Sequence, residues 1–289
     1  MLWVVFALLS ALFLSFADIF KKKVLFKEHA MEFSTVLSIF SFIIVLFLLP
    51  FVNFDISRNI LGLIYVVSVI STAGLLLMNK AIRHLEISEV EPLLNFSPAF
   101  LFILAYIYLG ERLGASQILG IILLIVGAYV LESDHKLKTF LSPFKKLLAS
   151  KYLFYVFLVI IMYSFSAIFD KIILTNIDKF SYIFFVFGFR ALNFIVLMII
   201  FYDGIKGIKH GVNKAGFPIA IISFLLFFSL MSYYSAISIA FVSLVIPIKR
   251  LSTLFSTAVG GELFHDHGLK YKIVACLIMI LGAVLVALK

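Results

Sequence analysis

Charge and cysteine are what this chain has least of. Asp, Glu, Lys and Arg together make up 13% of its 289 residues, about half the share found in soluble globular proteins. Hydrophobic residues reach 64%, including 34 Phe, and the mean hydropathy is +1.18, whereas a soluble domain is about 45–50% apolar. One soluble core could not bury this excess, so the composition predicts an integral membrane protein.

Other classes of protein are excluded by what the sequence does not contain. The single cysteine, Cys276, rules out a disulfide framework. We find no phosphate-binding loop, zinc-protease helix or Asp-rich lipid-transferase motif, which argues against an enzyme, and we expect no metal and no cofactor. His265, Asp266 and His267 are metal-binding types, but three adjacent residues do not make a site without partners. The net charge of +9 comes from short segments between apolar runs, which predicts membrane topology and no nucleic-acid partner.

Ten apolar segments are long enough to be membrane helices, each of which needs about 20 residues. They are residues 2–20, 33–51, 60–80, 91–110, 113–131, 152–173, 181–202, 216–238, 241–261 and 269–288. The first is followed, not preceded, by its basic residues, so we interpret it as a retained helix and not as a signal peptide. The longest connector, residues 132–151, is polar and basic and separates residues 1–131 from 152–289.

These two halves repeat each other. At an offset of 149 residues, Ser15, Phe16, Ile19, Phe20, Lys22 and Leu25 recur as Ser164, Phe165, Ile168, Phe169, Lys171 and Leu174. At an offset of 155, Ala81, Ile82, Ser88, Val90, Pro92, Gly127 and Ala128 recur as Ala236, Ile237, Ser243, Val245, Pro247, Gly282 and Ala283. Because each half holds five helices, the second half must enter the membrane upside down. The expected fold is all-α, with ten transmembrane helices in two inverted five-helix repeats and a substrate site at their interface.

The Lys and Arg residues between the segments predict the orientation. One side carries sixteen: Lys21, Lys22, Lys23, Lys27, Lys80, Arg83, Lys136, Lys138, Lys145, Lys146, Lys151, Lys206, Lys209, Lys214, Lys270 and Lys272. The other carries five: Arg58, Arg112, Lys171, Lys179 and Lys289. Since basic loops stay in the cytoplasm, we expect a multi-pass protein of the cell membrane with both termini outside.

Several short motifs of the first half recur more loosely in the second half, where Ala275 stands in place of Gly120. They are Glu91–Pro92, Gly110–Leu113, Gln117–Gly120 and Gly127–Ala128 in the first half, and Pro247, Gly261–Glu262 and Gly282 in the second. With these motifs the chain resembles the drug/metabolite transporter superfamily, in its ten-helix EamA-type branch. The resemblance implies alternating-access transport of small metabolites without naming a substrate. The motif pairs Glu111 with Glu262, whereas the offset pairs it with Asp266, and both pairings stay open.

Three cations, Arg190, Lys249 and Arg250, lie near the middle of their segments. A charge at that depth costs about 2.5–3.5 kcal/mol on insertion scales. The nearest acids, Asp18 and Asp170, are expected near helix ends, so we expect an anionic substrate to offset the buried charge. Lys249 and Arg250 also resemble the Lys-Arg pair with which the superfamily's organophosphate translocators hold phosphate. The alternative is structural, because long basic side chains can reach backbone carbonyls or the interface.

Polar residues at repeat-related positions extend the candidate substrate site. The offset of 155 pairs Asn95 with Arg250 and Asn79 with Tyr234. With Tyr233, these side chains are candidates to line a central cavity, against the alternative that they only pack between helices.

Two charged pairs occur near the end of the first helix of each half. Asp170 with Lys171 is echoed by Asp18 with Lys22. Such a pair could close a gate over the substrate or could form an ion pair at the end of its helix, and we favour the second hypothesis. We likewise expect Glu111 to contribute to folding or topology and not to bind the substrate.

The sequence thus predicts a secondary transporter that moves a small polar metabolite, with an anionic group on the substrate as the sharper hypothesis. One alternative is a flippase for lipids or lipid-linked sugars with the same fold. A membrane-embedded enzyme is less favoured because the spans hold no acid cluster. The expected partners are the small-molecule substrate and membrane lipid, and both a monomer and a homodimer fit.

Overall fold

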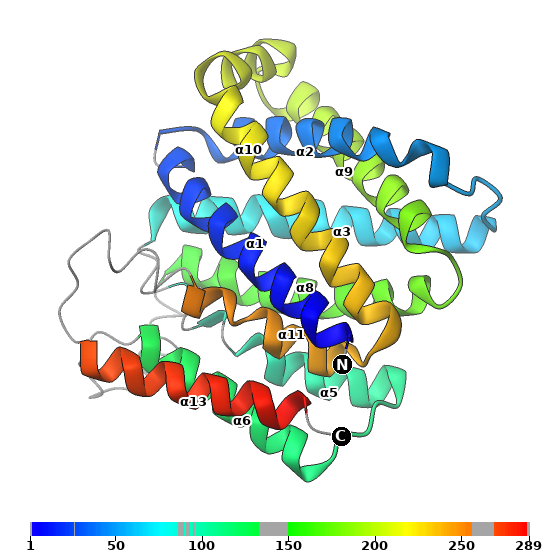
Figure 1. Cartoon of the computed structure of the whole chain (residues 1–289). Helices are drawn as coiled ribbons and strands as arrows, with labels where there is room; N and C mark the ends of the chain where they lie inside the picture. Colours follow the sequence, from blue (N-terminus) through cyan, green and yellow to red (C-terminus); the bar gives the residue numbers. More distant parts are fainter. Residues whose placement is uncertain are drawn as a thin grey trace.

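The computed structural model describes residues 2–25, 27–85, 90, 93–94, 96–132, 150–255 and 269–287. These ranges form helices joined by short connectors, and they contain no β-strand (Figure 1). Several residues singled out in the sequence lie outside them: Pro92, Asn95, Gly261, Glu262, His265, Asp266, His267 and most of the connector 132–151.

Each expected segment corresponds to a helix. The first half holds α1 (Leu2–Leu25), α2 (Ala30–Val45) with the 3-10 helix η1 (Leu46–Phe51), α3 (Arg58–His84), α5 (Ser97–Leu109) and α6 (Ala115–Glu132). The second holds α8 (Lys151–Leu174), α9 (Lys179–Phe201), α10 (Gly204–Ile239), α11 (Val242–Lys249) and α13 (Leu269–Ala287). The main differences are in length, since α1 continues past residue 20 to Leu25, and α11 ends at Lys249, well inside the expected segment 241–261.

Six of these elements are long and apolar enough to cross a bilayer: α1, α2 with η1, α3, α8, α9 and α10. Three shorter apolar helices accompany them, Ser97–Leu109, Ala115–Val130 and Val274–Ala287. The prediction of an all-helical, multi-pass membrane protein is therefore confirmed. The count of ten spans and the inversion of the second half stay predictions.

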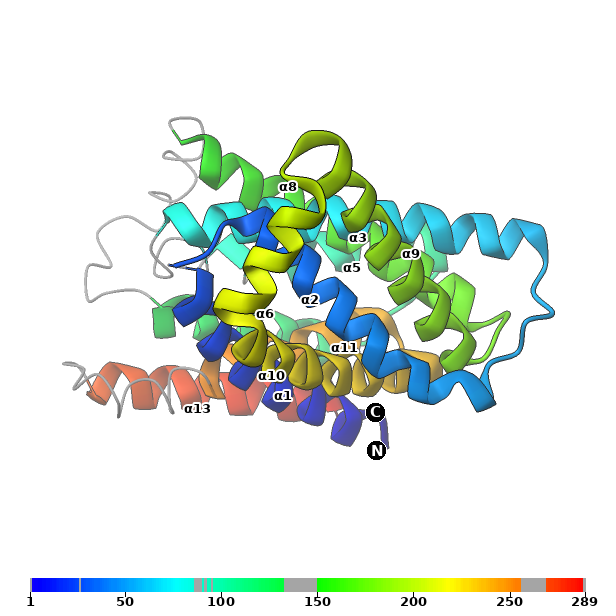
Figure 2. The same ribbon diagram turned by 90° about the horizontal axis from the view of Figure 1, so that it is seen from above.

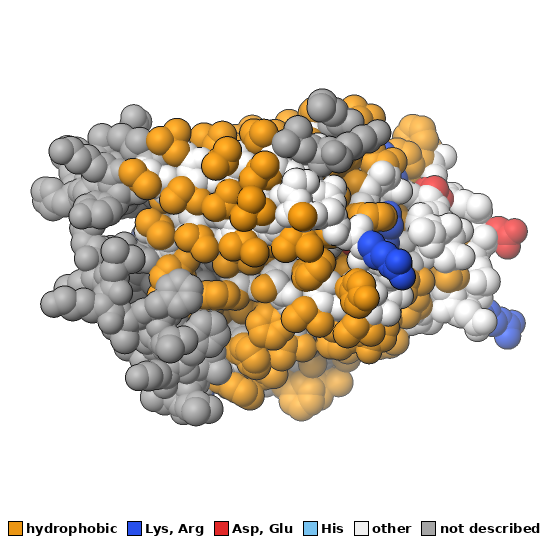
Figure 3. Space-filling view, turned by 90° about the horizontal axis from the view of Figure 1, so that it is seen from below, with side chains coloured by type: hydrophobic (Ala, Val, Ile, Leu, Met, Phe, Trp, Pro, Cys, Tyr) orange, Lys and Arg blue, Asp and Glu red, His pale blue; other side chains and the backbone are white. Residues whose placement is uncertain are grey.

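The surface carries the apolar side chains that a soluble protein would bury. On α13, Leu277, Ile280, Leu281 and Val284 are 51–60% exposed, and their spacing of three and four residues places them on one helix face. Hydrophobic side chains gather over the middle of the face shown in Figure 3. Such a face suits lipid, in which an exposed apolar side chain costs nothing.

The opposite face of α13 packs on α6 through glycines, as Figure 1 shows for the pair. A Cβ atom added to Gly282 would lie 2.8 Å from the carbonyl oxygen of Gly120, and one added to Gly120 would lie 2.7 Å from that of Gly282. At Gly127 it would lie 2.6 Å from the Cγ of Met279. Small residues let helix backbones approach closely in membranes, and Gly120, Gly127 and Gly282 do so between α6 and α13.

Helix pairing follows the same pattern in both halves (Figures 1 and 2). The contact of α1 with α10 has its counterpart in that of α8 with α3, and the contact of α1 with α11 in that of α8 with α5. The pairs α2–α9 and α6–α13 join equivalent helices. Exchanging the two halves therefore maps these six pairs onto one another or onto themselves.

Helix α10 is interrupted near its start. Ala215 has the non-helical dihedrals φ −138° and ψ 16°, and Pro218 follows. Proline lacks an N–H, and its ring clashes with the carbonyl four residues earlier, so it bends a helix. Residues 204–214 thus form a basic segment of their own direction ahead of the apolar remainder of α10, which includes the expected segment 216–238.

Candidate functional site

A buried acid and a buried tyrosine bind each other between α8 and α9. The carboxylate of Asp178 accepts hydrogen bonds from the backbone N–H groups of Phe180 (2.9 Å) and Ser181 (3.0 Å), so α9 begins here. Tyr182 follows in the first turn and donates from its hydroxyl to the Oδ1 of Asp170. Tyr182 is fully buried and Asp170 is 4% exposed, which makes this a hydrogen bond inside the protein.

Two tyrosines of α10 extend this contact towards α11. The ring of Tyr234 packs edge-on against that of Tyr182, with centroids 5.0 Å apart, and Tyr233 lies 5.2 Å from Tyr234. The Nζ of Lys249, the last residue of α11, sits 4.2 Å from the centre of the Tyr233 ring. An ammonium over an aromatic face is attracted by the ring's quadrupole, so the tyrosines help to hold Lys249 inside.

Arg190, two turns further along α9, faces the same tyrosines. Its Cζ lies 4.3 Å from the ring centre of Phe187, and it interacts electrostatically with Asp170, Tyr163 and Tyr182. Its Nε is buried and has no hydrogen-bond partner among the residues that the structure describes. A buried donor left unsatisfied costs about 1–3 kcal/mol, which marks this nitrogen as a place for an acceptor.

Arg250, just after α11, connects these residues to the first half of the chain. Its Nε and Nη2 donate to the Oγ of Ser97 at 3.1 and 2.9 Å, and Ser97 is the first residue of α5. Asp18 of α1 interacts electrostatically with Arg250, Lys249 and Lys21. We call the following eight residues the central cluster: Asp18, Asp170, Tyr182, Arg190, Tyr233, Tyr234, Lys249 and Arg250.

Glu111 positions α11, the helix that ends at Lys249 and is followed directly by Arg250. Its buried carboxylate accepts from the backbone N–H groups of Val242 (2.9 Å) and Ser243 (3.1 Å) and from the Ser243 hydroxyl. The first N–H groups of a helix lack partners within it, and a carboxylate satisfies them with favourable charge. Glu111 therefore ties the α5–α6 connector to the start of α11, which agrees with a role in folding.

The comparisons with known proteins can be set against this geometry. The sequence model of the EamA-like transporter family matches residues 1–133. These residues are therefore similar to the EamA-like transporters, which are part of the drug/metabolite transporter superfamily. No protein with a curated description matches the chain. A solved structure, titled only "Crystal structure of protein", is 12% identical and has a TM-score of 0.73, covering 99% of this chain and 98% of its own.

At that identity the likeness shows a shared fold along the full length and nothing about substrate. The family match confirms the resemblance drawn from the motifs, and it covers the first half of the chain. Members of the EamA-like family are membrane transporters, which is consistent with the transport function expected from the motifs.

One expectation about the buried charges needs correction. The sequence placed Asp18 and Asp170 near helix ends, away from the deep cations, yet both interact electrostatically with Lys249. The reason is that α1 continues to Leu25, so Asp18 lies well inside it, and Asp170 packs against the first turn of α9. The cations are thus partly offset by the protein itself.

The two expected charged pairs have different partners in the structure. Lys171 donates to the carbonyl oxygens of Ile237 (2.6 Å) and Ala240 (2.9 Å) at the end of α10, while Asp170 accepts from Tyr182. In α1, Lys22 is exposed, whereas Lys21 is 8% exposed and interacts with Asp18. A one-residue difference on a helix turns a side chain by about 100°, which the sequence offset could not resolve.

Of the two asparagines, Asn79 lies between α3 and α2. It is fully buried and donates from Nδ2 to the Oγ of Ser34 at 2.7 Å. Asn95 lies outside the described residues. Tyr182 and Ser97 were missed by the sequence analysis, although each is a polar residue in the first turn of an apolar helix that faces a residue already singled out.

Proposed function

We propose that the chain is a ten-helix secondary transporter that moves a small polar metabolite by alternating access, with its two halves as inverted repeats. The six helix pairs that map onto one another when the halves are exchanged support this proposal. In such transporters the substrate binds at the repeat interface, and one half rocks against the other. The central cluster draws residues from α1 and from α8 to α11, so it lies where both halves meet.

The proposed substrate carries an anionic group, a carboxylate or a phosphate, and the observation that carries this is the unsatisfied Nε of Arg190. A guanidinium presents parallel N–H groups that match either anion in a bidentate fashion. Lys249 and Arg250 add positive charge nearby. Asp18 and Asp170 reduce the excess of positive charge, and Asp170 accepts a hydrogen bond from Tyr182. Because the Nε of Arg190 has no acceptor among the described residues, Arg190 is the cation best placed to bind the substrate.

The test is ligand binding by the purified protein in detergent, followed as thermal stabilisation over a panel of carboxylates, phosphate esters, cations and neutral polyols. A ligand at 100 times its Kd stabilises by about 2.7 kcal/mol. For the anion that stabilises best, we expect Arg190→Gln to weaken binding at least about 30-fold, since loss of a buried charge partner costs about 2–5 kcal/mol. Arg190→Lys should rescue part of it.

Arg83→Gln is the matched control, because Arg83 lies at the end of α3 and bonds His29. It should bind the anion as the unchanged protein does. Selection of a cation from the panel, or full binding by Arg190→Gln, would refute the anion proposal while leaving the family untouched.

The proposed orientation has both termini outside and the basic loops in the cytoplasm, from the sixteen-to-five split of Lys and Arg. Reporter fusions after Lys136 and after Lys289 should show opposite sidedness, with Lys136 cytoplasmic. Equal sidedness would contradict ten spans, and exchanged sides would contradict the orientation.

A further inference from the structure

Three potential metal ligands meet away from the central cluster, where the chain passes between α1 and α2. Glu28 lies in the connector, Glu32 in the first turn of α2, and His210 on the 204–214 segment of α10. One ligand atom from each lies within 4.8 Å of the other two. These residues belong to both halves of the chain, so the group joins them outside the proposed substrate site.

Backbone features of α10 bring His210 to this place. The non-helical Ala215 gives the 204–214 segment its own direction. Gly211 then allows close approach to α2, because a Cβ atom there would lie 3.1 Å from the Cγ2 of Val36 and 3.5 Å from the Cβ of Glu32. His210 precedes this glycine, and its Nδ1 lies 2.9 Å from the Oε2 of Glu32.

A salt bridge with Lys214 satisfies only one of the two carboxylate oxygens of Glu28. Its Oε1 lies 3.3 Å from the Nζ of Lys214. The side chain is 3% exposed, and its other oxygen, Oε2, is buried without a hydrogen-bond partner among the described residues. A buried carboxylate oxygen with no donor is costly, and a cation at the group would satisfy it.

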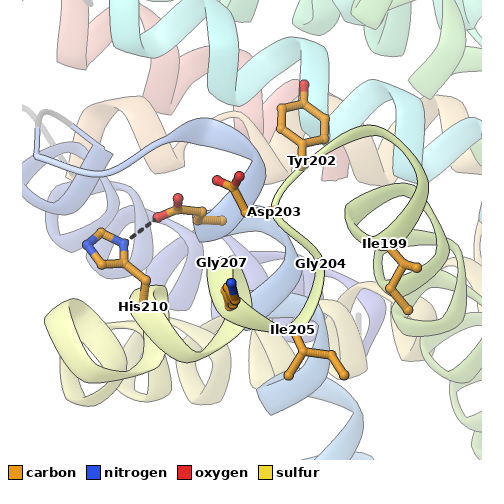
Figure 4. Close-up of a pocket in the computed structure, with 9 residues that line it drawn as sticks. Ile199, Tyr202, Asp203, Gly204, Ile205, Gly207 and His210 are labelled. Carbon is orange, nitrogen blue, oxygen red and sulfur yellow. Dashed lines mark hydrogen bonds and ion pairs between the residues drawn. The ribbon is translucent and has the colours of Figure 1, made fainter.

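A cavity of about 870 Å³ is lined by Glu32 and His210, two members of the group. Figure 4 shows its lining, with the His210 ring bonded to a glutamate carboxylate and with Asp203 and Tyr202 near by. The glutamate is Glu32. The cavity thus provides an entry path, and it leaves room for water to complete a coordination shell.

We propose that Glu28, Glu32 and His210 form a binding site for a transition-metal dication of the Zn²⁺ class. Carboxylate oxygen and imidazole nitrogen bind Zn²⁺ at about 2.0–2.2 Å, and three protein ligands with a water are a common set. The imidazole favours such an ion over Mg²⁺ and Ca²⁺, which take oxygen ligands. Binding displaces the Lys214 ammonium from Glu28 and links the α1–α2 connector to α10.

The experiment is calorimetric titration of the full-length protein, purified in detergent and stripped of metal, with ZnCl₂. We expect one ion per chain and no comparable binding of MgCl₂. His210→Gln should weaken Zn²⁺ binding at least about tenfold, and its half-exposed position makes it safe for folding. Glu28→Gln and Glu32→Gln should do the same, with thermal unfolding as the check that each variant folds.

The Lys214→Met variant distinguishes a metal site from a group that holds only the ion pairs Lys214–Glu28 and His210–Glu32. Removing a competing ammonium should tighten Zn²⁺ binding about two- to fivefold, the range of an exposed ion pair. His84→Gln, whose ring stacks on Tyr152 at 4.3 Å, is the matched histidine control and should leave binding unchanged.

Three results would overturn the proposal. They are unchanged Zn²⁺ binding by His210→Gln, equal affinity for Mg²⁺, and loss of binding in a His265→Gln/His267→Gln variant. The last would place the ion at the 265–267 histidines. None of these outcomes depends on transport activity, so the proposed function stands or falls separately.

Discussion

The central cluster and the α6–α13 contact both lie inside this protein, but the first consists of charged and tyrosine side chains and the second of glycine backbone. The cluster holds three cations, two acids and three tyrosines, contributed by helices of both halves. The α6–α13 contact has backbone lying against backbone at Gly120 and Gly282, with Met279 against Gly127.

The difference follows from what a bilayer offers. Lipid is as apolar as leucine, so α13 gains little by hiding Leu or Ile and instead packs through small residues that allow close approach. A charged group has no such freedom, because it is costly in lipid and persists only where protein or substrate satisfies it. We therefore expect changes at the glycines to act on stability, and changes at the cluster to act first on binding.

The largest effect on stability is expected at Glu111, which supports the cluster from the connector before α6. Glu111→Ala removes the acceptor of the Val242 and Ser243 N–H groups and of the Ser243 hydroxyl. Each buried donor left unsatisfied costs about 1–3 kcal/mol, so thermal unfolding in detergent should show a loss of about 3 kcal/mol or more. Glu111→Gln keeps one acceptor and should lose less; equal losses would contradict the capping role.

The α6–α13 contact comes next. Gly282→Ala places a Cβ 2.8 Å from a carbonyl oxygen and 2.9 Å from the Leu124 nitrogen, backbone atoms that cannot move aside alone. Overpacking of this kind costs about 1–3 kcal/mol, while anion binding should persist. Gly62→Ala, where nothing lies within 4 Å, should be neutral or slightly stabilising, and a similar loss at Gly62 would show that close packing is not the cause.

Tyr182→Phe tests the cluster itself. It removes the donor to the buried Asp170 carboxylate while keeping the ring beside Tyr234. A hydrogen bond to a charged group contributes about 1.5–3 kcal/mol, so we expect a loss near the lower end together with weaker anion binding. Tyr65→Phe, at an exposed ring, should change neither quantity. Lost stability with unchanged binding would assign Tyr182 to structure alone.

The smallest effect is expected on the lipid face of α13. Leu281→Ala shortens a side chain that is 55% exposed, so lipid fills the space and the free energy of unfolding should change by no more than about 0.5 kcal/mol. Leu124→Ala, at a buried position of α6, should cost about 2 kcal/mol or more by leaving a cavity. Equal effects would contradict the assignment of the exposed face to lipid.

Much of the architecture could be predicted from local sequence. Apolar runs of about 20 residues give helices in lipid whatever their neighbours, since the backbone must satisfy its own hydrogen bonds there. The recurrence of Gly127 as Gly282 was likewise visible in the sequence. The cations at 190, 249 and 250 were visible because charge in an apolar run is conspicuous.

The partners of those charges could not be predicted in this way. Asp170 and Lys171 are neighbours in sequence, but one binds Tyr182 and the other binds the end of α10. The proposed metal site could not be predicted either, because its residues Glu32 and His210 are 178 positions apart in the sequence. They meet because α10 bends at Ala215 and because Gly211 lets it approach α2 closely.

The sequence by itself determined that lipid surrounds the protein, where its helices lie and which family it resembles. These follow from composition, the length of apolar runs and short motifs. Only the tertiary structure decided which charges meet. Contacts between side chains depend on helix rotation and on where each helix ends. An error of one residue in either turns a side chain to another neighbour, as Lys21 and Lys22 show.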